Sequence, residues 1–349
     1  MNDDLNYRLA LDRIERTHRQ KLTWLRQLAP NWSEFQSASE RIPGQWTKVV
    51  VQTVYELQRA EEQHRAHGIQ TLVLGSPDYP RRLAEIPDPP PVLYVKGHLR
   101  EEPRCLAVVG TRNPSPDGLL MAEYWVHELA LAQPCIVSGL ALGIDAAAHE
   151  EALRSGLTTW AVMAHGLETA HPGRNARLAE RILLEGGAWI SEWPFGTPPR
   201  AEFFPRRNRI IAGLSDGVLV VEASMKSGAS ITAKVAHGYH RNVFALPGRI
   251  SDVHSQGCLS LVADHIAELA LHPAQLLVGM NWDSVPSTQR THHMGPSADA
   301  LLAHLSSPMR VEELQRRTGL ATEDILATLA QLMWSGRVAA RSGSYVRKS

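Results

Sequence analysis

The chain has little of several features that would by themselves narrow its function. Only three of its 349 residues are cysteines, Cys105, Cys135 and Cys258, and their odd number and wide spacing are typical of a reduced cytosolic protein. Its 36 basic and 36 acidic side chains give a formal net charge of +0, so no global basic field attracts nucleic acid. No apolar run reaches membrane-spanning length, and the acidic N-terminus lacks a signal-like run. We therefore expect a cytoplasmic protein without membrane contact, in which any polyanion site rests on local clusters.

The length and the order of apolar segments predict a Rossmann-like α/β domain. With 349 residues the chain allows two to three domains, and 44% hydrophobic content can fill a sizeable core. From Leu106 to about Leu277, short apolar runs alternate with helical segments, which is typical of a parallel sheet. The expected strands are 106–109, 135–137, 159–163, 188–190, 218–222 and 243–246.

Three turns next to these strands have the character of anion sites. Gly110-Thr111-Arg112 follows the first strand, Ser138-Gly139 follows the second, and Ser227-Gly228 with Thr232 opens a helix after the strand at 218–222. Backbone N–H groups at such turns and at helix N-termini bind phosphate. Close packing of helix on strand is an alternative explanation for the glycines. Because the carboxyl ends of parallel strands lie along one edge, we expect one shared cleft.

The segment from Glu202 to Gly213 is the densest cluster of cationic and aromatic side chains. Phe204, Arg206, Arg207, Asn208 and Arg209 fall between two apolar strands, so we expect a loop at the cleft. Guanidinium groups bind phosphate oxygens bidentately, and a phenyl face stacks on an unpaired base of any identity. The pattern indicates a site for single-stranded nucleic acid. The structural alternative is that the arginines form salt bridges within the domain and that the phenylalanines belong to its core.

In order and spacing, these motifs resemble the signature of the DNA-processing protein A (DprA, also called Smf) family over residues 75–260. Asp145, His149, Val221-Glu222-Ala223 and Ala245-Leu246-Pro247-Gly248 extend the resemblance. It implies a protein that binds and protects incoming single-stranded DNA and loads the recombinase RecA onto it in natural transformation and recombination, with no known catalysis or cofactor. It also implies a homodimer, for which we expect an interface near Ile210-Ile211 and Val235-Tyr239.

The chain departs from the family pattern at two places. Leu259-Ser260-Leu261-Val262 stands where the family usually has an asparagine followed by Leu-Ile, which puts a local contact in doubt. The usual Tyr-Pro pair is His171-Pro172, which keeps the turn-forming proline.

Two kinds of enzyme are alternatives to a binding protein. Ser138, Asp145 and His149 are residue types of a hydrolase, but Ser138 lacks the Gly-x-Ser-x-Gly frame of an exposed nucleophile. A Rossmann-like nucleotide phosphoribohydrolase would need a Pro-Gly-Gly-x-Gly-Thr-x-x-Glu loop, and the chain has Ser227-Gly228-Ala229-Ser230 instead. A scaffold that binds only proteins would leave the arginine cluster unexplained. We therefore predict a binding protein with no catalytic residues.

Smaller modules are expected on both sides of the central domain at 68–279. Residues 1–67 predict a helical domain, similar in position to the sterile-alpha-motif-like domain of the family, with Trp24, Trp32 and Trp46 in its core. Residues 280–297 predict a polar linker, whose His292-His293 pair lacks the further ligands that a metal ion needs.

Residues 298–349 predict three helices followed by a hairpin, which resembles a winged helix. The expected third helix, Glu323 to Trp334, is acidic at its start and apolar along most of its length, which argues against reading of a DNA groove. We expect protein contact or weak binding of the DNA backbone through basic residues near the hairpin, namely Arg337, Arg341, Arg347 and Lys348.

Overall fold

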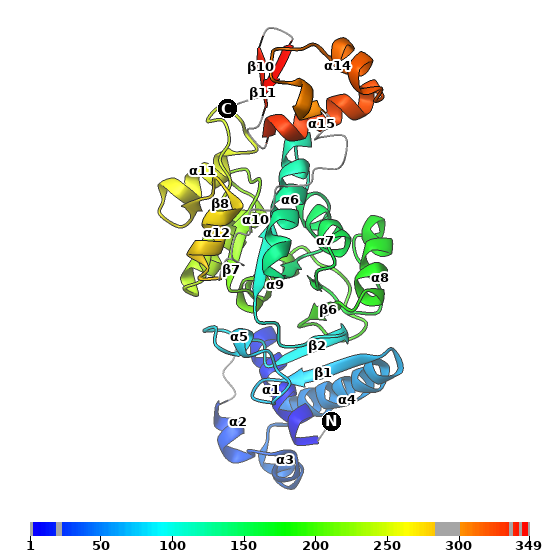
Figure 1. Ribbon diagram of the computed structural model, residues 1–349. Coiled ribbons are helices and arrows are strands. Elements are labelled where there is room, and N and C mark those ends of the chain that lie inside the picture. The colour runs from blue at the N-terminus through cyan, green and yellow to red at the C-terminus, as the bar shows by residue number, and fades with distance from the viewer. Residues whose placement is uncertain (1–2, 19–22, 283–300, 335–337, 342–343, 348–349) are drawn as a thin grey trace. The chain divides into compact units, whose positions relative to one another are not determined.

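The structure is a computed structural model that describes residues 3–18, 23–282, 301–334, 338–341 and 344–347 (Figure 1). The chain divides into two compact units, Met1–Val285 and Pro286–Ser349. The smaller unit has a hydrophobic core of its own, formed by the leucines of its helices. Among the described residues, no helix is both long and apolar enough to cross a bilayer.

A nine-stranded sheet runs through the described part of the first unit, in the order β1-β2-β6-β5-β4-β3-β7-β8-β9. Strands β3 to β9 pair with one another in parallel. Strand β2 is antiparallel to both of its neighbours, β1 and β6. The bounds are β1 (Ile69–Val73), β2 (Val92–Gly97), β3 (Cys105–Val109), β4 (Cys135–Ser138), β5 (Thr159–Val162), β6 (Ala188–Ser191), β7 (Gly217–Val220), β8 (Asn242–Ala245) and β9 (Glu268–Leu269).

Helices cover both faces of this sheet because its strands are apolar on both sides. In β3, Leu106 and Val108 pack with α6 and α7, while Ala107 and Val109 pack with α9 and α10 on the opposite face. The bounds are α5 (Arg81–Ala84), α6 (Pro116–Leu129), η2 (Ala130–Ala132), α7 (Ile144–Arg154), η3 (Gly173–Asn175), α8 (Ala176–Leu184), α9 (Phe203–Leu214), α10 (Gly228–Gly238), α11 (Gln256–Ala263) and α12 (Pro273–Gly279).

The six expected strands and the Rossmann-like architecture are confirmed, but β1, β2 and β9 were not predicted. The expected loop at the arginine cluster is wrong, because these residues form α9. Pro205 falls in the first turn of this helix, where a missing N–H breaks no hydrogen bond. Ile210 and Leu214 then return at a spacing of four residues and anchor α9 in the core.

The N-terminal segment forms the expected helices α1 (Asp3–His18), α2 (Thr23–Leu28), α3 (Trp32–Ser37), η1 (Ser39–Arg41) and α4 (Gly44–Ala66). Trp32 stacks on Phe35 with ring centroids 5.4 Å apart, and Trp46 also packs against the core. The expectation for Trp24 is wrong: its side chain is 40% exposed, because the short α2 buries Leu25 instead. The same core includes Tyr94 and Trp189 of the sheet, so the helices and strands share it.

Two other expectations about this unit need correction. Met280 and Trp282 are buried in its core, so the linker expected at 280–297 begins no earlier than residue 283. Its remaining residues, with His292 and His293, lie outside the described residues. Ile210 and Ile211 are 0% and 1% exposed, so the expected dimer interface at this pair is wrong.

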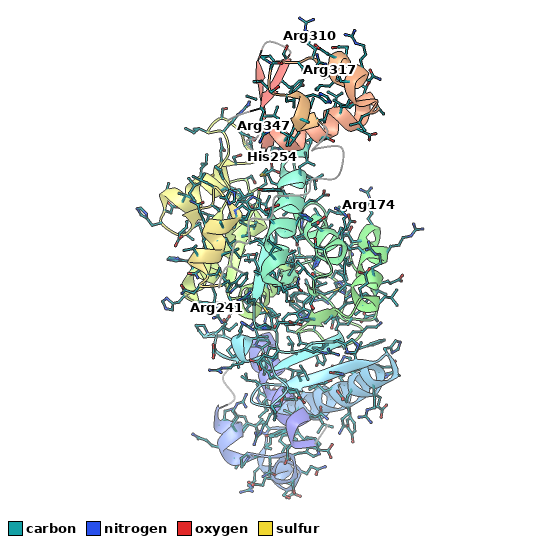
Figure 2. The ribbon with its side chains drawn as sticks, in the orientation of Figure 1. Arg174, Arg241, His254, Arg310, Arg317 and Arg347 are labelled. Atoms are coloured by element: carbon teal, nitrogen blue, oxygen red, sulfur yellow. The ribbon has the colours of Figure 1, made fainter. Side chains whose placement is uncertain are left out.

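The second unit is a winged helix, as expected. Residues 301–304 are helical, followed by α14 (Val311–Thr318), α15 (Thr322–Trp334), and the antiparallel pair β10 (Val338–Arg341) and β11 (Ser344–Arg347). Figure 2 shows Arg310, Arg317 and Arg347 on this unit. Arg317 pairs with Glu313 at 2.8 Å. Arg337 and Lys348 lie outside the described residues, as does the side chain of Arg341.

One histidine in the core of the first unit gives the fold a pH dependence. His149 of α7 is fully buried, and its Nδ1 lies 2.7 Å from Thr159 Oγ1. That hydroxyl donates its own hydrogen to the carbonyl of Ile136, so it accepts from the imidazole. Burial, with a smaller effect from the charge of Arg207, lowers the pKa of His149 to about 3. The folded protein therefore holds His149 neutral.

This histidine should make the free energy of unfolding decrease in acid. In the unfolded chain His149 takes up a proton near pH 6.5, whereas the folded chain resists it down to about pH 3. The contribution of His149 to the free energy of unfolding should thus be fully present above pH 6.5. It should decrease by about 1.4 kcal/mol per pH unit between pH 6.5 and about pH 3. His149→Gln should show a shallower pH dependence in urea unfolding, whatever its stability at neutral pH. Equal slopes for the two proteins would contradict this account.

Candidate functional site

A cleft of about 490 Å³ opens where β3 and β7 end. Strand β3 pairs with β4 on one side and with β7 on the other, so the strand order reverses here. Ligands of open α/β sheets bind at such a reversal, outside the carboxyl ends of the strands. Four segments line the cleft: the turn after β3, the loop after β4 with the start of α7, the first turns of α9, and the loop that leads into α10.

The turn after β3 presents one arginine to the cleft. Glu222 fixes this turn, because its buried carboxylate accepts hydrogen bonds from Ser115 N at 2.9 Å and Ser115 Oγ at 2.6 Å. Thr111 N donates to the carbonyl of the same glutamate at 2.8 Å. The exposed Arg112 lies over Phe204 of α9, with its Cζ 5.0 Å from the ring centroid. A cation and an aromatic ring from distant segments thus meet at the rim.

Arg207 is the floor of the cleft. Its side chain is buried, and its guanidinium occupies the space where a Cβ at position 139 would stand, so a larger residue there would displace the arginine. Its Nε is buried without a hydrogen-bond partner among the described residues. Burial lowers the pKa of Arg207 to about 10, with Asp145 acting to raise it and Arg112 to lower it. The group therefore stays charged at neutral pH.

Asp145 is the carboxylate that accompanies this buried cation. Its Oδ2 accepts hydrogen bonds from Gly139 N at 3.1 Å and from Ala141 N at 3.4 Å. Burial raises the pKa of Asp145, and Arg207 is the largest of the influences that lower it. The carboxylate thus accepts hydrogen bonds from the backbone of the loop after β4, and both Asp145 and Arg207 are among the residues that line the cleft.

The start of α10 forms a further wall. The Ser227 side chain caps this helix by accepting a hydrogen bond from Ser230 N at 3.2 Å. Asn208 Nδ2 and Thr232 Oγ1 each donate to the carbonyl of Gly228 at 3.2 Å. These two side chains hold the first turn in place, and the N-terminal end of an α-helix favours an anion.

The structure brings most of the predicted site residues to this cleft. They lie after the end of a strand, directly before α10, or in the first two turns of α9 or α10, and they are Gly110, Thr111, Arg112, Phe204, Arg207, Asn208, Ser227, Gly228 and Thr232. Contact of these residues with DNA stays a prediction. Lining residues that sequence reasoning missed include Ala201, Ile211, Ser224 and Ile231, whose small or apolar side chains give no chemical signal.

Four predicted residues lie elsewhere. Ser138 is fully buried and donates its hydroxyl to Val108 O at 2.6 Å, and Gly139 lies beneath Arg207. Arg209 pairs with Glu192 and donates to the carbonyl of Asp88. Arg206 lines a different cavity. A helix turns by about 100° per residue, so α9 directs successive arginines to different sides.

The residues of the hydrolase alternative are not arranged as a nucleophile and its base. His149 bonds to Thr159, Ser138 bonds to a backbone carbonyl, and Asp145 accepts from backbone N–H groups. Within the described ranges, no group of three His, Cys, Asp or Glu residues is placed to hold a metal ion.

Comparisons with known proteins converge on one family. A family model described as DNA recombination-mediator protein A matches residues 70–281, and one described as the DprA winged helix domain matches residues 285–344. The chain is 39% identical over 282 residues to protein Smf of Escherichia coli (strain K12). The matched region covers 77% of this chain and 75% of that protein.

Two solved structures are similar to this chain. DNA processing protein A (DprA) from Streptococcus pneumoniae matches with a TM-score of 0.60 and 36% identity, covering 66% of this chain and 81% of the other. DNA processing protein A from Helicobacter pylori matches with a TM-score of 0.55 and 29% identity, covering 61% and 95%, and its structure concerns a single-stranded DNA binding mode.

Proposed function

The chain belongs to the DNA recombination-mediator protein A family, and from that premise we propose that its cleft binds single-stranded DNA. The observation that supports this best is Arg207, a buried cation among the residues that line the cleft. Its Nε is shielded from solvent and has no hydrogen-bond partner among the described residues. Burying a cation without full hydrogen bonding is unfavourable, and the negative charge of a phosphate in the cleft would offset part of this cost.

Around Arg207 the cleft offers two further features that suit a phosphate. Arg112 is exposed at the rim, and the capped N-terminus of α10 adds the positive end of a helix dipole. Because the formal net charge of the whole chain is +0, attraction to a polyanion rests on this local group.

The aromatic ring at the rim favours a single strand over a duplex. Phe204 is partly exposed beside Arg112, and a phenyl face or a guanidinium plane can stack on an unpaired base. In a duplex each base is already stacked on its neighbours and cannot reach the ring. Stacking on any base is tolerated, so we propose binding with little sequence preference.

We further propose that the protein is a cytoplasmic homodimer that loads RecA onto single strands in natural transformation and recombination. Family membership supports this role. Two clefts that hold the same strand would raise the overall affinity, because the second binding event is intramolecular. Each cleft could still release and rebind its own nucleotides, which would leave nucleotides accessible to a recombinase.

Arg112→Ala should weaken binding of single strands without disturbing the fold, since Arg112 is exposed. The loss of one charge-assisted contact should cost about 1.5–3 kcal/mol of binding free energy. The plot of log affinity against log salt should become shallower by about 0.7. Arg100→Ala is the matched control, because Arg100 is also exposed but precedes β3, away from the strand ends that form the cleft. Equal behaviour of the two variants in fluorescence-anisotropy titrations would remove Arg112 from the site.

Phe204→Ala should weaken binding in a different way. If the ring stacks on a base, the variant should lose about 1–3 kcal/mol of binding free energy with an unchanged salt slope, because stacking releases no counterions. Phe204→Tyr keeps the ring and should bind nearly as wild type. A fall in melting temperature without a binding defect would assign Phe204 to the core instead.

RecA loading is tested on single strands precoated with single-strand-binding protein. The chain should accelerate growth of RecA filaments on these strands, and its solution mass at micromolar concentration should be that of a dimer. No acceleration would reject the loader role, whereas acceleration by a strictly monomeric protein would reject the paired clefts.

A further inference from the structure

Helix α9 lies between two cavities. Phe204 and Arg207 line the cleft, whereas Phe203 and Arg206 line a second cavity of about 530 Å³. We name this second cavity the side cavity; Tyr94, Trp193, Arg200, Phe203 and Arg206 are among its lining residues. Residues three apart lie on the same side of a helix, so each cavity receives one aromatic ring and one arginine from the same two turns.

The chemistry of the side cavity repeats that of the cleft. In the cleft, Arg112 lies 5.0 Å from the centroid of Phe204. In the side cavity, Arg200 lies 5.7 Å from the centroid of Phe203, which stacks on Trp193 with centroids 4.8 Å apart and an interplanar angle of 30°. Planar cations and aromatic rings are the groups on which nucleobases stack.

The charge of the side cavity is also suited to a phosphate. Arg200 and Arg206 are exposed, and neither side chain forms an ion pair within the described part of the chain. Glu192 is the carboxylate among the lining residues, and it pairs with Arg209. The lining of the side cavity thus carries two positive charges and one negative charge, which is paired with Arg209.

The walls of the side cavity are held in place without a ligand. Leu9 of α1 and Leu57 of α4 form an apolar side, so the N-terminal helices contribute to it. The loop that follows β6 is tied at two points: Phe195 N donates to His64 Nε2 at 2.7 Å, and Thr197 O accepts from Gly166 N at 2.9 Å. A preformed wall lowers the entropy cost of ordering a bound strand.

We propose that the side cavity is a second nucleotide subsite for the DNA strand that occupies the cleft. This inference rests on the proposed function. The two cavities draw on neighbouring residues: Arg200 lines one and Ala201 the other, and Phe203 and Phe204 are consecutive. Consecutive Cα atoms are about 3.8 Å apart, so the two cavities lie close to the same turn of α9, and a strand that occupies both would cross this turn.

Strand length separates the two subsites experimentally. Oligothymidylates of about three and about twelve nucleotides are titrated against the full chain, since single-strand sites span roughly 4–16 nucleotides per domain. Arg206→Ala should bind the short strand as wild type does and should bind the long strand about tenfold more weakly, the effect of one lost charge-assisted contact. Arg112→Ala should weaken both strands. Arg100→Ala is the control for the loss of one positive charge.

A second measurement does not depend on affinity. Ultraviolet cross-linking of the long strand, followed by peptide mass spectrometry, should place cross-links within residues 193–206 at Trp193 or Phe203, and Arg206→Ala should reduce them. If Arg206→Ala matches Arg100→Ala on every strand and no cross-link falls at Trp193 or Phe203, the subsite is rejected while the cleft stands. If the wild-type chain binds neither strand, the proposed function itself is rejected, and the subsite with it.

Discussion

The buried guanidinium of Arg207 is the constraint on which the site depends. It occupies the space above Gly139 where any side chain would stand, so the loop after β4, α9 and the start of α7 must fit around it. Asp145 keeps the same loop in place through its bonds to backbone N–H groups. A buried cation with an unpaired Nε is unfavourable in the free protein. Such local violations of good packing are expected where a protein binds a ligand.

The surrounding groups follow from how α9 meets the sheet. Ile210 and Leu214 bury one side of the helix, which leaves its first turn between the cleft and the side cavity. Each cavity then pairs one phenylalanine with an arginine, Arg112 from the turn after β3 and Arg200 from the loop directly before α9. This arrangement explains how a chain with no net charge can concentrate positive charge and flat surfaces in one region, and why the proposed ligand is a flexible strand rather than a stiff duplex.

Sequence pattern predicted six of the nine described strands of the sheet and the location of the cleft, because apolar runs and turn residues are local signals. Gly110, Ser227 and Arg112 were placed correctly at strand ends or helix starts. The orientation of α9 was not predictable in this way, since Pro205 and three arginines obscure its helical pattern. Arg209 pairs with Glu192 and donates a hydrogen bond to the carbonyl of Asp88, which is far away in the sequence. The buried hydroxyl of Ser138 donates to the carbonyl of Val108. Which polar side chain faces a ligand and which is used inside the fold depends on such distant contacts.

The central claim, that the cleft holds an unpaired strand through a few phosphates and a stacked base, is tested most directly by a comparison of strand types. Single- and double-stranded oligonucleotides of the same sequence are titrated against the wild-type chain over a range of salt concentrations. The account predicts tighter binding of the single strand, with log affinity falling against log salt by about 0.7 for each phosphate held. Equal or tighter binding of the duplex, or an affinity for single strands that salt does not change, would contradict it.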